Sequence, residues 1–378
     1  MTFAAFAIVF LLGIHLYLLQ ANSEHDTGSL WISPLTGEKG VLIPPSAVTP
    51  LREVDLELYT IRINTWKRLE QLMVSIEHHA TCPGVAQIQV VWCDEEQDPP
   101  QELERFPKVV VERHSVNTLN ERFHILQETP TMGILSMDDD VLRPCEAIDS
   151  GFFKWTQNPH RMVGFDARTH VVDDTGTWKY GYMSTTEKSN QYSLSLPRYC
   201  FIHRDYMNSY ITHLPRPIFQ HVAEVFNCED IAMSFWISHL TDGRPPLLAD
   251  NWSMKSMIKL YSPERISGTH NHKKLRDACV DSFAQQLGLK GKLKKGVIEH
   301  KEAPFFQCGA PGDKAPANWR VVDRHAALLE KIHHWKHIKP SEFLKELSQL
   351  RNHVIHRAFV LGLIENTTPW KERWEKPL

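Results

Sequence analysis

Short apolar runs alternate with segments whose apolar residues recur every three or four positions between residues 54 and 160. The runs predict buried strands, and the three-to-four spacing predicts amphipathic helices. The predicted strands lie at residues 56–63, 88–92, 108–112 and 132–138, and the predicted helices at 69–76, 119–126 and 144–155. Strands that alternate with helices in this way predict βαβ units and a mostly parallel central sheet, that is, an α/β fold.

The pattern changes in the second half of the chain. Glycines, tyrosines and polar runs between residues 163 and 210 predict short antiparallel strands and loops, and apolar spacing at residues 222–240 and 274–287 predicts two helices. Residues 290–295 form a basic, glycine-bearing linker, and apolar positions at residues 320–363 predict one or two further helices. We therefore expect a globular domain over residues 54–295 and a helical C-terminal extension over residues 296–378.

Residues 3–19 are almost wholly apolar. This segment is typical of a signal anchor or a secretory signal peptide, which we place at residues 1–21. Proline, serine and glycine are scattered through residues 22–53, which we interpret as a stem. Both interpretations place the domain in a lumen of the secretory pathway: either anchored in the Golgi or endoplasmic reticulum membrane as a single-pass type II protein, or secreted after cleavage.

The most distinctive stretch reads Met-Gly-Ile-Leu-Ser-Met-Asp-Asp-Asp-Val at residues 132–141. It is an apolar run that ends in three carboxylates, and open α/β sheets bind ligands at the carboxyl ends of their strands. Adjacent carboxylates repel one another, and a divalent cation offsets that repulsion. Hard oxygen ligands select Mg²⁺ or Mn²⁺, and substrate phosphates often complete the shell, as a nucleotide-sugar donor would. A solvated acidic turn is the alternative interpretation of Asp138, Asp139 and Asp140.

Composition and charge exclude several classes of protein. The net charge is −3 and the hydrophobic content is 42%, so the chain can bury a large core and has no basic field for nucleic acid. It contains neither GxGxxG nor GxxxxGK[ST], which disfavours a dinucleotide-binding fold and a P-loop NTPase. Seven cysteines suit an oxidising compartment but leave at least one without an intramolecular disulfide partner. None has a CxxC spacing, so we do not expect a zinc site.

Several other residues are candidates for chemistry. Glu229 and Asp230 open an apolar helix after Asn227-Cys228, where a carboxylate could approach an acceptor hydroxyl or could only complement the helix dipole. Arg68, Asn117 and Arg122 could pair with a diphosphate or be solvated. His270 or His272 could complete a metal shell, or lie on the surface.

In their order along the chain, these motifs resemble the C-terminal catalytic domain of the exostosins, glycosyltransferase family 64. The resemblance covers roughly residues 54–290, and its most specific part is Asn-Cys-Glu-Asp-Ile-Ala-Met at residues 227–233, followed by Arg276 and Cys279. The other matching segments are residues 90–92, 117–122, 137–140, 163–165, 168–171, 180–181 and 191–193. Two segments depart from the family: Cys93-Asp94 stands where it carries Asn, and residues 196–200 stand where it has small residues.

The resemblance implies a retaining transferase of GT-A fold that uses a nucleotide-sugar donor and Mn²⁺ (or Mg²⁺). It implies that Asp140 is the principal metal ligand and Asp138 a second one, and that Asp138 and Asp139 contact the donor. It implies donor-nucleotide contacts from Arg68, Asn117 and Arg122, and catalytic roles for Asp230 near the acceptor and Arg276 at the leaving diphosphate. It also implies a disulfide between Cys228 and Cys279. Retention in this family is attributed to front-face attack, in which the diphosphate accepts the proton.

The function expected from this resemblance is transfer of an N-acetylhexosamine from a UDP-sugar to a glycan or glycolipid acceptor. Another hexose donor, such as GDP-mannose in glycolipid synthesis, is the first alternative. A catalytically silent lumenal partner of a transferase is an alternative of another class, which the intact Asp138–Asp140, Asp230 and Arg276 disfavour. A metal-dependent phosphoesterase is a third, disfavoured by the lack of His/Asp metal-ligand motifs along the sheet.

Overall fold

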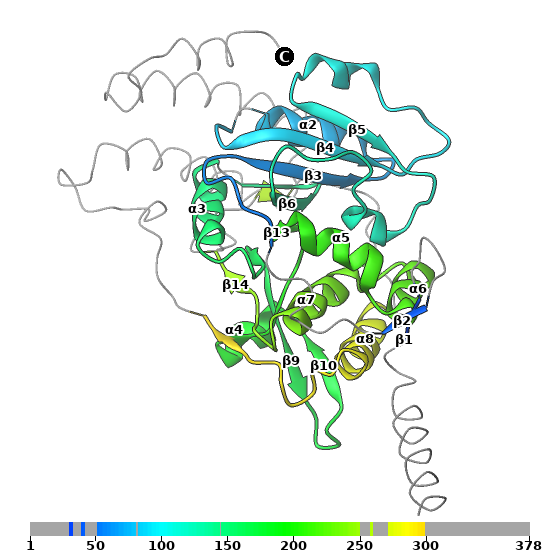
Figure 1. Cartoon of the computed structure of the whole chain (residues 1–378), viewed down its shortest axis with the longest axis vertical. Coiled ribbons are helices and arrows are strands. Elements are labelled where there is room, and N and C mark those ends of the chain that lie inside the picture. Colours follow the sequence, from blue (N-terminus) through cyan, green and yellow to red (C-terminus); the bar gives the residue numbers. More distant parts are fainter. Residues whose placement is uncertain are drawn as a thin grey trace, which may run out of the picture.

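The computed structural model describes residues 30–32, 39–41, 51–80, 82–143, 145–249, 258–259 and 271–298. Figure 1 shows the arrangement of the elements in these ranges. The expected anchor at residues 1–21, nearly all of the C-terminal extension and His270 lie outside the described residues. No helix among the described residues is both long enough and apolar enough to cross a bilayer.

A seven-stranded sheet forms the centre of the described part of the chain. Its strand order is β14-β8-β13-β6-β3-β4-β5, and only β13 runs antiparallel to its neighbours. The strands are β3 (Tyr59–Thr65), β4 (Val85–Trp92), β5 (Val109–Arg113), β6 (Gly133–Asp138), β8 (Val163–Gly164), β13 (Tyr199–His203) and β14 (Leu247–Leu248). The sequence-based prediction of an α/β fold with a mostly parallel sheet is therefore confirmed.

Helices cover both faces of this sheet. Alternate residues of a strand point to opposite faces, so Ile61 and Ile63 of β3 pack with α2 (Leu69–His79) and α3 (Cys145–Thr156). Ile134 of β6 and Ile202 of β13 belong to the other core, beneath α5 (Arg204–His213), α6 (Arg216–Val225), α7 (Glu229–Leu240) and α8 (His272–Gln286). Because all strands but β13 run parallel, their carboxyl ends lie at one edge of the sheet, between the helices of the two faces.

A smaller antiparallel sheet extends the second core. It has the order β10-β9-β12, and α7 and α8 pack against it, as Figure 1 shows at the end of the molecule away from β5. Its strands are β9 (Ala167–Val172), β10 (Trp178–Gly181) and β12 (Leu194–Ser195). The predicted short antiparallel strands are thus present, and β10 places Tyr180 against α8.

The remaining elements are short. They are β1 (Leu30–Ile32), β2 (Lys39–Val41), β7 (Val141–Leu142), β11 (Gln191–Tyr192), β15 (Ile258–Lys259), β16 (Gly296–Val297), α4 (Met183–Ser189) and the 3₁₀ helices η2 (Gln101–Arg105) and η3 (Leu119–Phe123). The strands β1 and β2 pair within the segment expected to be a stem. The pairing of β16 with β11 ties the chain to the domain just beyond residue 295.

The structure corrects three predicted elements. Leu56 and Leu58 are exposed and precede β3, because that strand begins only at Tyr59. The predicted helix at residues 119–126 is the single 3₁₀ turn η3, and Leu126 lies outside it with a half-exposed side chain. The predicted helix over residues 222–240 is two helices, because Phe226 and Cys228 adopt left-handed backbone conformations between α6 and α7.

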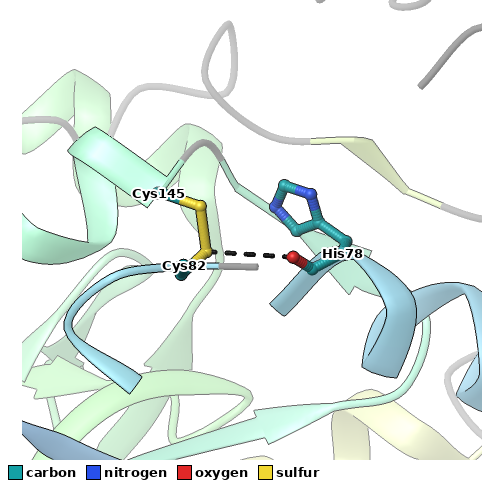
Figure 2. A group of neighbouring side chains, drawn as sticks. All are labelled: His78, Cys82 and Cys145. Carbon is teal, nitrogen blue, oxygen red and sulfur yellow. Dashed lines mark hydrogen bonds between the residues drawn. A yellow bond between two sulfur atoms is a disulfide. The ribbon is translucent and has the colours of Figure 1, made fainter. Parts of the chain in front are cut away.

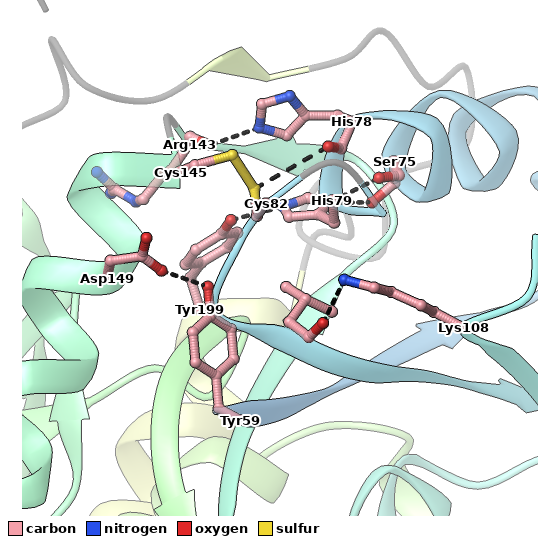
Figure 3. Close-up of a disulfide and its surroundings, with 11 residues drawn as sticks. Tyr59, Ser75, His78, His79, Cys82, Lys108, Arg143, Cys145, Asp149 and Tyr199 are labelled. Atoms are coloured by element: carbon pink, nitrogen blue, oxygen red, sulfur yellow. Dashed lines mark hydrogen bonds between the residues drawn. A yellow bond between two sulfur atoms is a disulfide. The ribbon is translucent and has the colours of Figure 1, made fainter. Parts of the chain in front are cut away.

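Two disulfides cross-link the described residues. Cys228 and Cys279 are joined, as the resemblance implied. Cys82 and Cys145, whose pairing the sequence left open, join the loop after α2 to the start of α3 (Figure 2). Figure 3 shows this second disulfide next to the buried side chains between β3 and the two helices. Cys93 and Cys200 are free and buried, and Cys308 lies outside the described residues.

Candidate functional site

A cavity of about 560 Å³ opens at the carboxyl ends of β3 and β6. These strands are parallel neighbours in which Asn64 pairs with Asp138, so the turns that follow them meet at the same edge of the sheet. The cavity is lined by residues from both ends of the domain: Asn64, Trp66, Arg68, Asn117, Leu119, Arg122, Asp138, Asp140, Arg168, Tyr180, Tyr182, Leu196, Pro197, Arg198, Phe226, Asn227, Glu229, Asp230, His272 and Arg276. Nine of the ten residues predicted to act at the site or to form its disulfide thus line it or cross-link its wall.

Asp138 and Asp140 face the cavity, whereas Asp139 does not. Asp138 accepts a hydrogen bond from Arg122, which also donates to the carbonyl of Pro197. Burial alone would raise the pKa of Asp138, but the guanidinium of Arg122 lowers it and keeps the carboxylate ionised. Asp138 is therefore an anion that a buried cation holds in place at the cavity wall.

Asp139 lies beneath the site, with its side chain fully buried. It accepts a hydrogen bond from Thr65 Oγ1 at 2.8 Å and pairs with Arg68 Nη2 at 2.7 Å. Burial raises its pKa to about 7, even though Arg68 acts in the opposite direction. Asp139 does not line the cavity and pairs with Arg68, which reaches Asp140 at 3.6 Å; the donor contact that the resemblance implied for Asp139 stays a prediction.

The opposite wall is built by α7 and α8. Arg276 donates to Asp230 and, at 3.1 Å, to Oδ1 of Asn227, and its guanidinium lies 4.1 Å from the centre of the Tyr180 ring. Burial would lower the pKa of Arg276, but the nearby carboxylate of Asp230 raises it, so this side chain is a fixed cation. Asp230 and Arg276, for which the resemblance implied catalytic roles, form a buried ion pair in this wall.

The geometry before α7 explains how Asp230 reaches the cavity. Cys228 has φ of 74° just before the helix, a left-handed conformation that costs a residue with a Cβ about 1 kcal/mol or more. The disulfide to Cys279 and a hydrogen bond from the Cys228 amide to Oδ1 of Asn227 hold it there. The break turns the first residues of α7 into the cavity, where the helix dipole stabilises carboxylates.

Glu229 is a cavity residue to which the sequence analysis gave no catalytic role of its own. Burial, reinforced by the neighbouring Asp230, raises the pKa of Glu229 to about 7. Two carboxyl groups side by side at the start of α7 thus differ in environment, and only Asp230 is paired with Arg276. The Asn-Cys-Glu-Asp motif indicated two carboxylates at this helix start, but the sequence does not show which of them forms the ion pair with Arg276.

Arg198 was also missed, although its segment was recognised as a departure from the family. It forms an ion pair with Asp166, to which Arg168 also donates at 2.7 Å. Burial would raise the pKa of Asp166, but the two arginines lower it to about 2. Arg168 and Arg198 both line the cavity, so this wall carries positive charge that the sequence pattern alone did not place there.

Aromatic side chains border the rest of the cavity. Trp66, with 40% of its surface exposed, lies on the β3 side, and Tyr182 and Phe226 lie on the other. The Tyr182 hydroxyl is 3.1 Å from Nδ1 of His272. His272 thus lines the cavity with its ring beside a tyrosine hydroxyl. The contacts of the described residues include none between His272 and Asp140. Aromatic rings beside charged groups give the cavity wall apolar faces together with hydrogen-bonding groups.

The acidic edge fits the divalent cation that the resemblance implied. Asp138 and Asp140 offer hard carboxylate oxygens to the cavity. Oδ1 of Asn64, which pairs with Asp138 across the strands, is buried without a hydrogen-bond partner in the described structure. Carboxylate and amide oxygens are ligands that Mg²⁺ and Mn²⁺ accept, and such sites usually leave positions for phosphate oxygens.

Comparison with known proteins places these features in a family. A model of the "Glycosyl transferase family 64 domain" matches residues 59–302. The "Glycosylinositol phosphorylceramide mannosyl transferase 1" of Arabidopsis thaliana is 32% identical over 249 residues, which cover 61% of this chain and 72% of that protein. "Exostosin-2" of Mus musculus is 28% identical over 271 residues, which cover 70% of this chain and 35% of that protein.

One further relative and one solved structure are also similar to this chain. The "Glucosamine inositolphosphorylceramide transferase 1" of Arabidopsis thaliana is 30% identical over 246 residues, 62% of this chain and 30% of that protein. The chain therefore matches about a third of the length of this relative and of the exostosin. A solved structure titled "Crystal structure of GalNAc-T7 with UDP, GalNAc and Mn2+" has a TM-score of 0.42 and 11% identity, covering 78% of this chain and 57% of that one. That likeness is too low to bear on the fold or on ligands.

Proposed function

The chain belongs to glycosyltransferase family 64 and is a glycosyltransferase, and on that premise we propose that it transfers an N-acetylhexosamine from a UDP-sugar, with retention of configuration and with the help of a divalent metal ion. The acceptor in this proposal is a glycan or a glycolipid. One observation carries the proposal: a single cavity joins the carboxylates at the end of β6 to the Asp230–Arg276 pair of α7 and α8. In this proposal the wall at the ends of β3 and β6 binds the donor, and the wall of α7 and α8 carries out the transfer.

The β3–β6 wall is the proposed donor side. Asp140, with Asp138, would hold Mn²⁺ or Mg²⁺, which supplies positive charge to the diphosphate of the nucleotide-sugar. Arg68 and Arg122 stand on either side of these carboxylates, held by Asp139 and Asp138 respectively. Arginines fixed in this way can donate to diphosphate or nucleotide oxygens without first losing side-chain entropy. Asn117 lines the same wall and adds a neutral amide.

The α7–α8 wall is the proposed transfer side. In the reaction, the bond between the anomeric carbon and the diphosphate breaks, the acceptor oxygen bonds to that carbon on the same face, and its proton passes to the departing diphosphate. Arg276 is a fixed cation that would stabilise the charge developing on the diphosphate. Asp230 holds Arg276 in place and offers its carboxylate to an acceptor hydroxyl. It need not form a covalent intermediate.

A GDP-mannose donor is the second candidate. The "Glycosylinositol phosphorylceramide mannosyl transferase 1" of Arabidopsis thaliana favours this donor, because the match covers 72% of that protein and its name describes a mannosyl transferase. Cys93 stands where the family carries Asn, and burial raises the pKa of its thiol to about 12, so this side chain is a neutral, buried thiol rather than an amide. This position therefore offers no amide contact to the base of the donor.

The proposed setting is the lumen of the Golgi or endoplasmic reticulum. There the N-terminal apolar segment at residues 1–21 would anchor the chain in the membrane, with the catalytic domain on the lumenal side, or would be cleaved to release it. Disulfides between Cys228 and Cys279 and between Cys82 and Cys145 support an oxidising compartment. The proposed partners are the donor, the acceptor and the membrane, without nucleic acid.

The proposal is tested with the full chain and a panel of UDP-N-acetylglucosamine, UDP-N-acetylgalactosamine, UDP-glucose and GDP-mannose. Each donor is incubated with and without Mn²⁺, and release of the nucleotide and binding of the donor are both measured. We expect Mn²⁺-dependent turnover of a UDP-N-acetylhexosamine. Preference for GDP-mannose would instead select the second candidate, and neither turnover nor metal-dependent binding with any of the four donors would contradict both.

A further inference from the structure

A second cluster of metal-ligand side chains lies behind the cavity wall. His114 follows β5, Glu121 lies in η3, and His124 ends that turn. Nδ1 of His114 is 2.7 Å from Oε2 of Glu121, and Nδ1 of His124 is 2.9 Å from the same oxygen. The three potential ligand atoms all lie within 4.8 Å of one another. None of the three residues lines the cavity described above, so they form a separate group.

The surroundings of His114 resemble those of a metal-bound imidazole. Its second nitrogen, Nε2, lies 3.5 Å from Oε2 of Glu112, and both side chains are buried. A histidine that binds a metal through one nitrogen usually directs the other toward a carboxylate, which fixes the ring and raises its basicity. Glu112 takes this outer position, on the side of the His114 ring opposite Glu121. Simple ion pairs between Glu121 and the two histidines would not need a second carboxylate there.

The outer carboxylate is itself fixed. Arg62 donates to Glu112 at 2.7 Å and to Gln89 at 2.6 Å, and the amide of Gln127 donates to the other oxygen of Glu112 at 2.8 Å. Arg62 also donates to the carbonyl of His124 at 2.8 Å. One buried arginine therefore holds both the backbone of His124 and the carboxylate behind His114, which fixes the two histidines relative to each other before any ion arrives.

The chemistry of the group selects among metals. Two imidazoles and one carboxylate are the protein ligands of many three-ligand zinc sites, and imidazole favours zinc over Mg²⁺ or Ca²⁺. The His124 side chain is 26% exposed and that of Glu121 11%, so the cluster opens to solvent on one side. That opening provides an entry path for an ion and access for water, which would be the fourth ligand of a tetrahedral ion.

We propose that His114, Glu121 and His124 form a zinc site, with His114 and His124 binding through Nδ1, Glu121 through its carboxylate, and Glu112 as the outer carboxylate. This revises the expectation that the chain lacks a zinc site, which rested only on cysteine spacing. In the spacing H-x₆-E-x₂-H, Glu121 and His124 are three residues apart, as neighbours on one 3₁₀ turn are, and His114 joins them because η3 brings Glu121 within 2.7 Å of it. Arg122 is next to Glu121 in the chain, so the ion would stiffen the turn that carries it.

The proposal does not depend on the donor or the reaction and is tested by metal binding alone. The full chain, first stripped with a chelator, is titrated with Zn²⁺ against a chromophoric competitor and separately with Co²⁺, whose visible absorption reports tetrahedral coordination. We expect one zinc ion per wild-type chain with this signature. His124→Gln and Glu121→Gln should each weaken zinc binding more than about 100-fold, because each removes one of three protein ligands.

Two control variants separate this site from other binding. His160→Gln removes an exposed histidine elsewhere and should leave zinc affinity unchanged. Asp140→Asn removes the proposed donor-site ligand and should also keep the zinc ion. Zinc should raise the melting temperature of the wild type and of both controls but not of His124→Gln, since a ligand that binds only the folded state stabilises it. A wild-type chain without the tetrahedral Co²⁺ signature, or equal zinc affinity in His124→Gln, would overturn the proposal.

Discussion

At the scale of single residues, the roles proposed for Asp140 and Asp230 can be separated by experiment. Asp140 lies near Arg68 on the proposed donor side, whereas Asp230 is paired with Arg276 on the proposed transfer side. We expect Asp140→Asn to abolish the Mn²⁺ dependence of donor binding. Asp230→Asn should leave donor affinity within about threefold and lower turnover on the order of 10²-fold or more, as loss of a transition-state contact does. Calorimetric donor binding and steady-state turnover measure the two effects.

Asparagine is the appropriate substitution because it preserves the shape of each side chain and keeps one oxygen that can accept a hydrogen bond. Asp230→Ala would remove both the hydrogen-bond acceptor and the volume of this side chain beside the buried guanidinium of Arg276, and the larger loss of stability would obscure the result. If Asp230→Asn keeps the full rate, the role assigned to Asp230 is wrong. If Asp140→Asn binds donor with unchanged Mn²⁺ dependence, the metal site lies elsewhere.

The sequence predicted most of this site, because the motifs occur in an order that resembles one family. Asp138, Asp140, Asp230 and Arg276 do meet in one cavity. The sequence could not show that Asp139 is buried away from the cavity, because the side to which each of three adjacent carboxylates points depends on the turn geometry after β6. Arg198 was missed for another reason: its relation to the cavity is created by Asp166, in a segment that has no periodic pattern of its own.

At the scale of elements, the two disulfides hold different parts of the fold. Cys228–Cys279 links α7, which carries Asp230, to α8, which carries Arg276. Cys82–Cys145 links the end of α2 to the start of α3 on the other face of the sheet (Figure 3). The first was implied by resemblance. The second was not predicted, because the remaining five cysteines allow several pairings and sequence alone gives no distance between two helices.

Removing each disulfide should therefore have a different outcome. The double replacements Cys82→Ser/Cys145→Ser and Cys228→Ser/Cys279→Ser should each lower the free energy of unfolding by about 2–4 kcal/mol. Only the second should also reduce turnover at saturating donor, because it frees the break that directs Asp230 toward Arg276. Denaturant unfolding and turnover below the unfolding transition measure the two effects. Equal turnover in the two variants would contradict the positioning role of Cys228–Cys279.

The position of the α6–α7 break also shows why this element was mispredicted. The apolar spacing of α6 continues into α7 with only Phe226, Asn227 and Cys228 between them, so periodicity alone predicts one helix. The break depends on a covalent bond to α8, which is distant in the chain. Tertiary constraint thus overrides local spacing at the point where the site is built, and this is where a sequence-based prediction is expected to fail.

At the scale of the whole molecule, the sheet was predictable because its strands are buried runs between amphipathic helices. The strand order was not, because β13 enters antiparallel between β6 and β8 and only long-range pairing decides its place. Tyr199 at the start of β13 shows what this insertion contributes. Its hydroxyl reaches His79 at the end of α2, so one buried hydrogen bond joins the middle of the sheet to the helix that covers it.

This contact makes the stability of the fold depend on pH. His79 is fully buried, and its two nitrogens lie 2.6 Å from the carbonyl of Ser75 and 2.7 Å from the hydroxyl of Tyr199 (Figure 3). The neutral ring satisfies both groups, donating through Nδ1 to Ser75 and accepting through Nε2 from Tyr199. Burial lowers the pKa of His79 to about 4, whereas the carbonyl of Ser75 acts in the opposite direction.

The direction of the effect follows from proton linkage. Below about pH 6.5 the unfolded chain takes up a proton at His79 and the folded chain does not, so stability falls as the pH drops from about 6.5 toward about 4. Between pH 7 and pH 5 this residue should account for about 2 kcal/mol of lost unfolding free energy. In His79→Gln, the loss of unfolding free energy between pH 7 and pH 5 should be smaller by this amount, whatever the variant's stability at pH 7. Denaturant unfolding at the two pH values measures it. His160→Gln, at an exposed histidine, should behave as the wild type, and an equal loss in His79→Gln and wild type would show that His79 is not responsible.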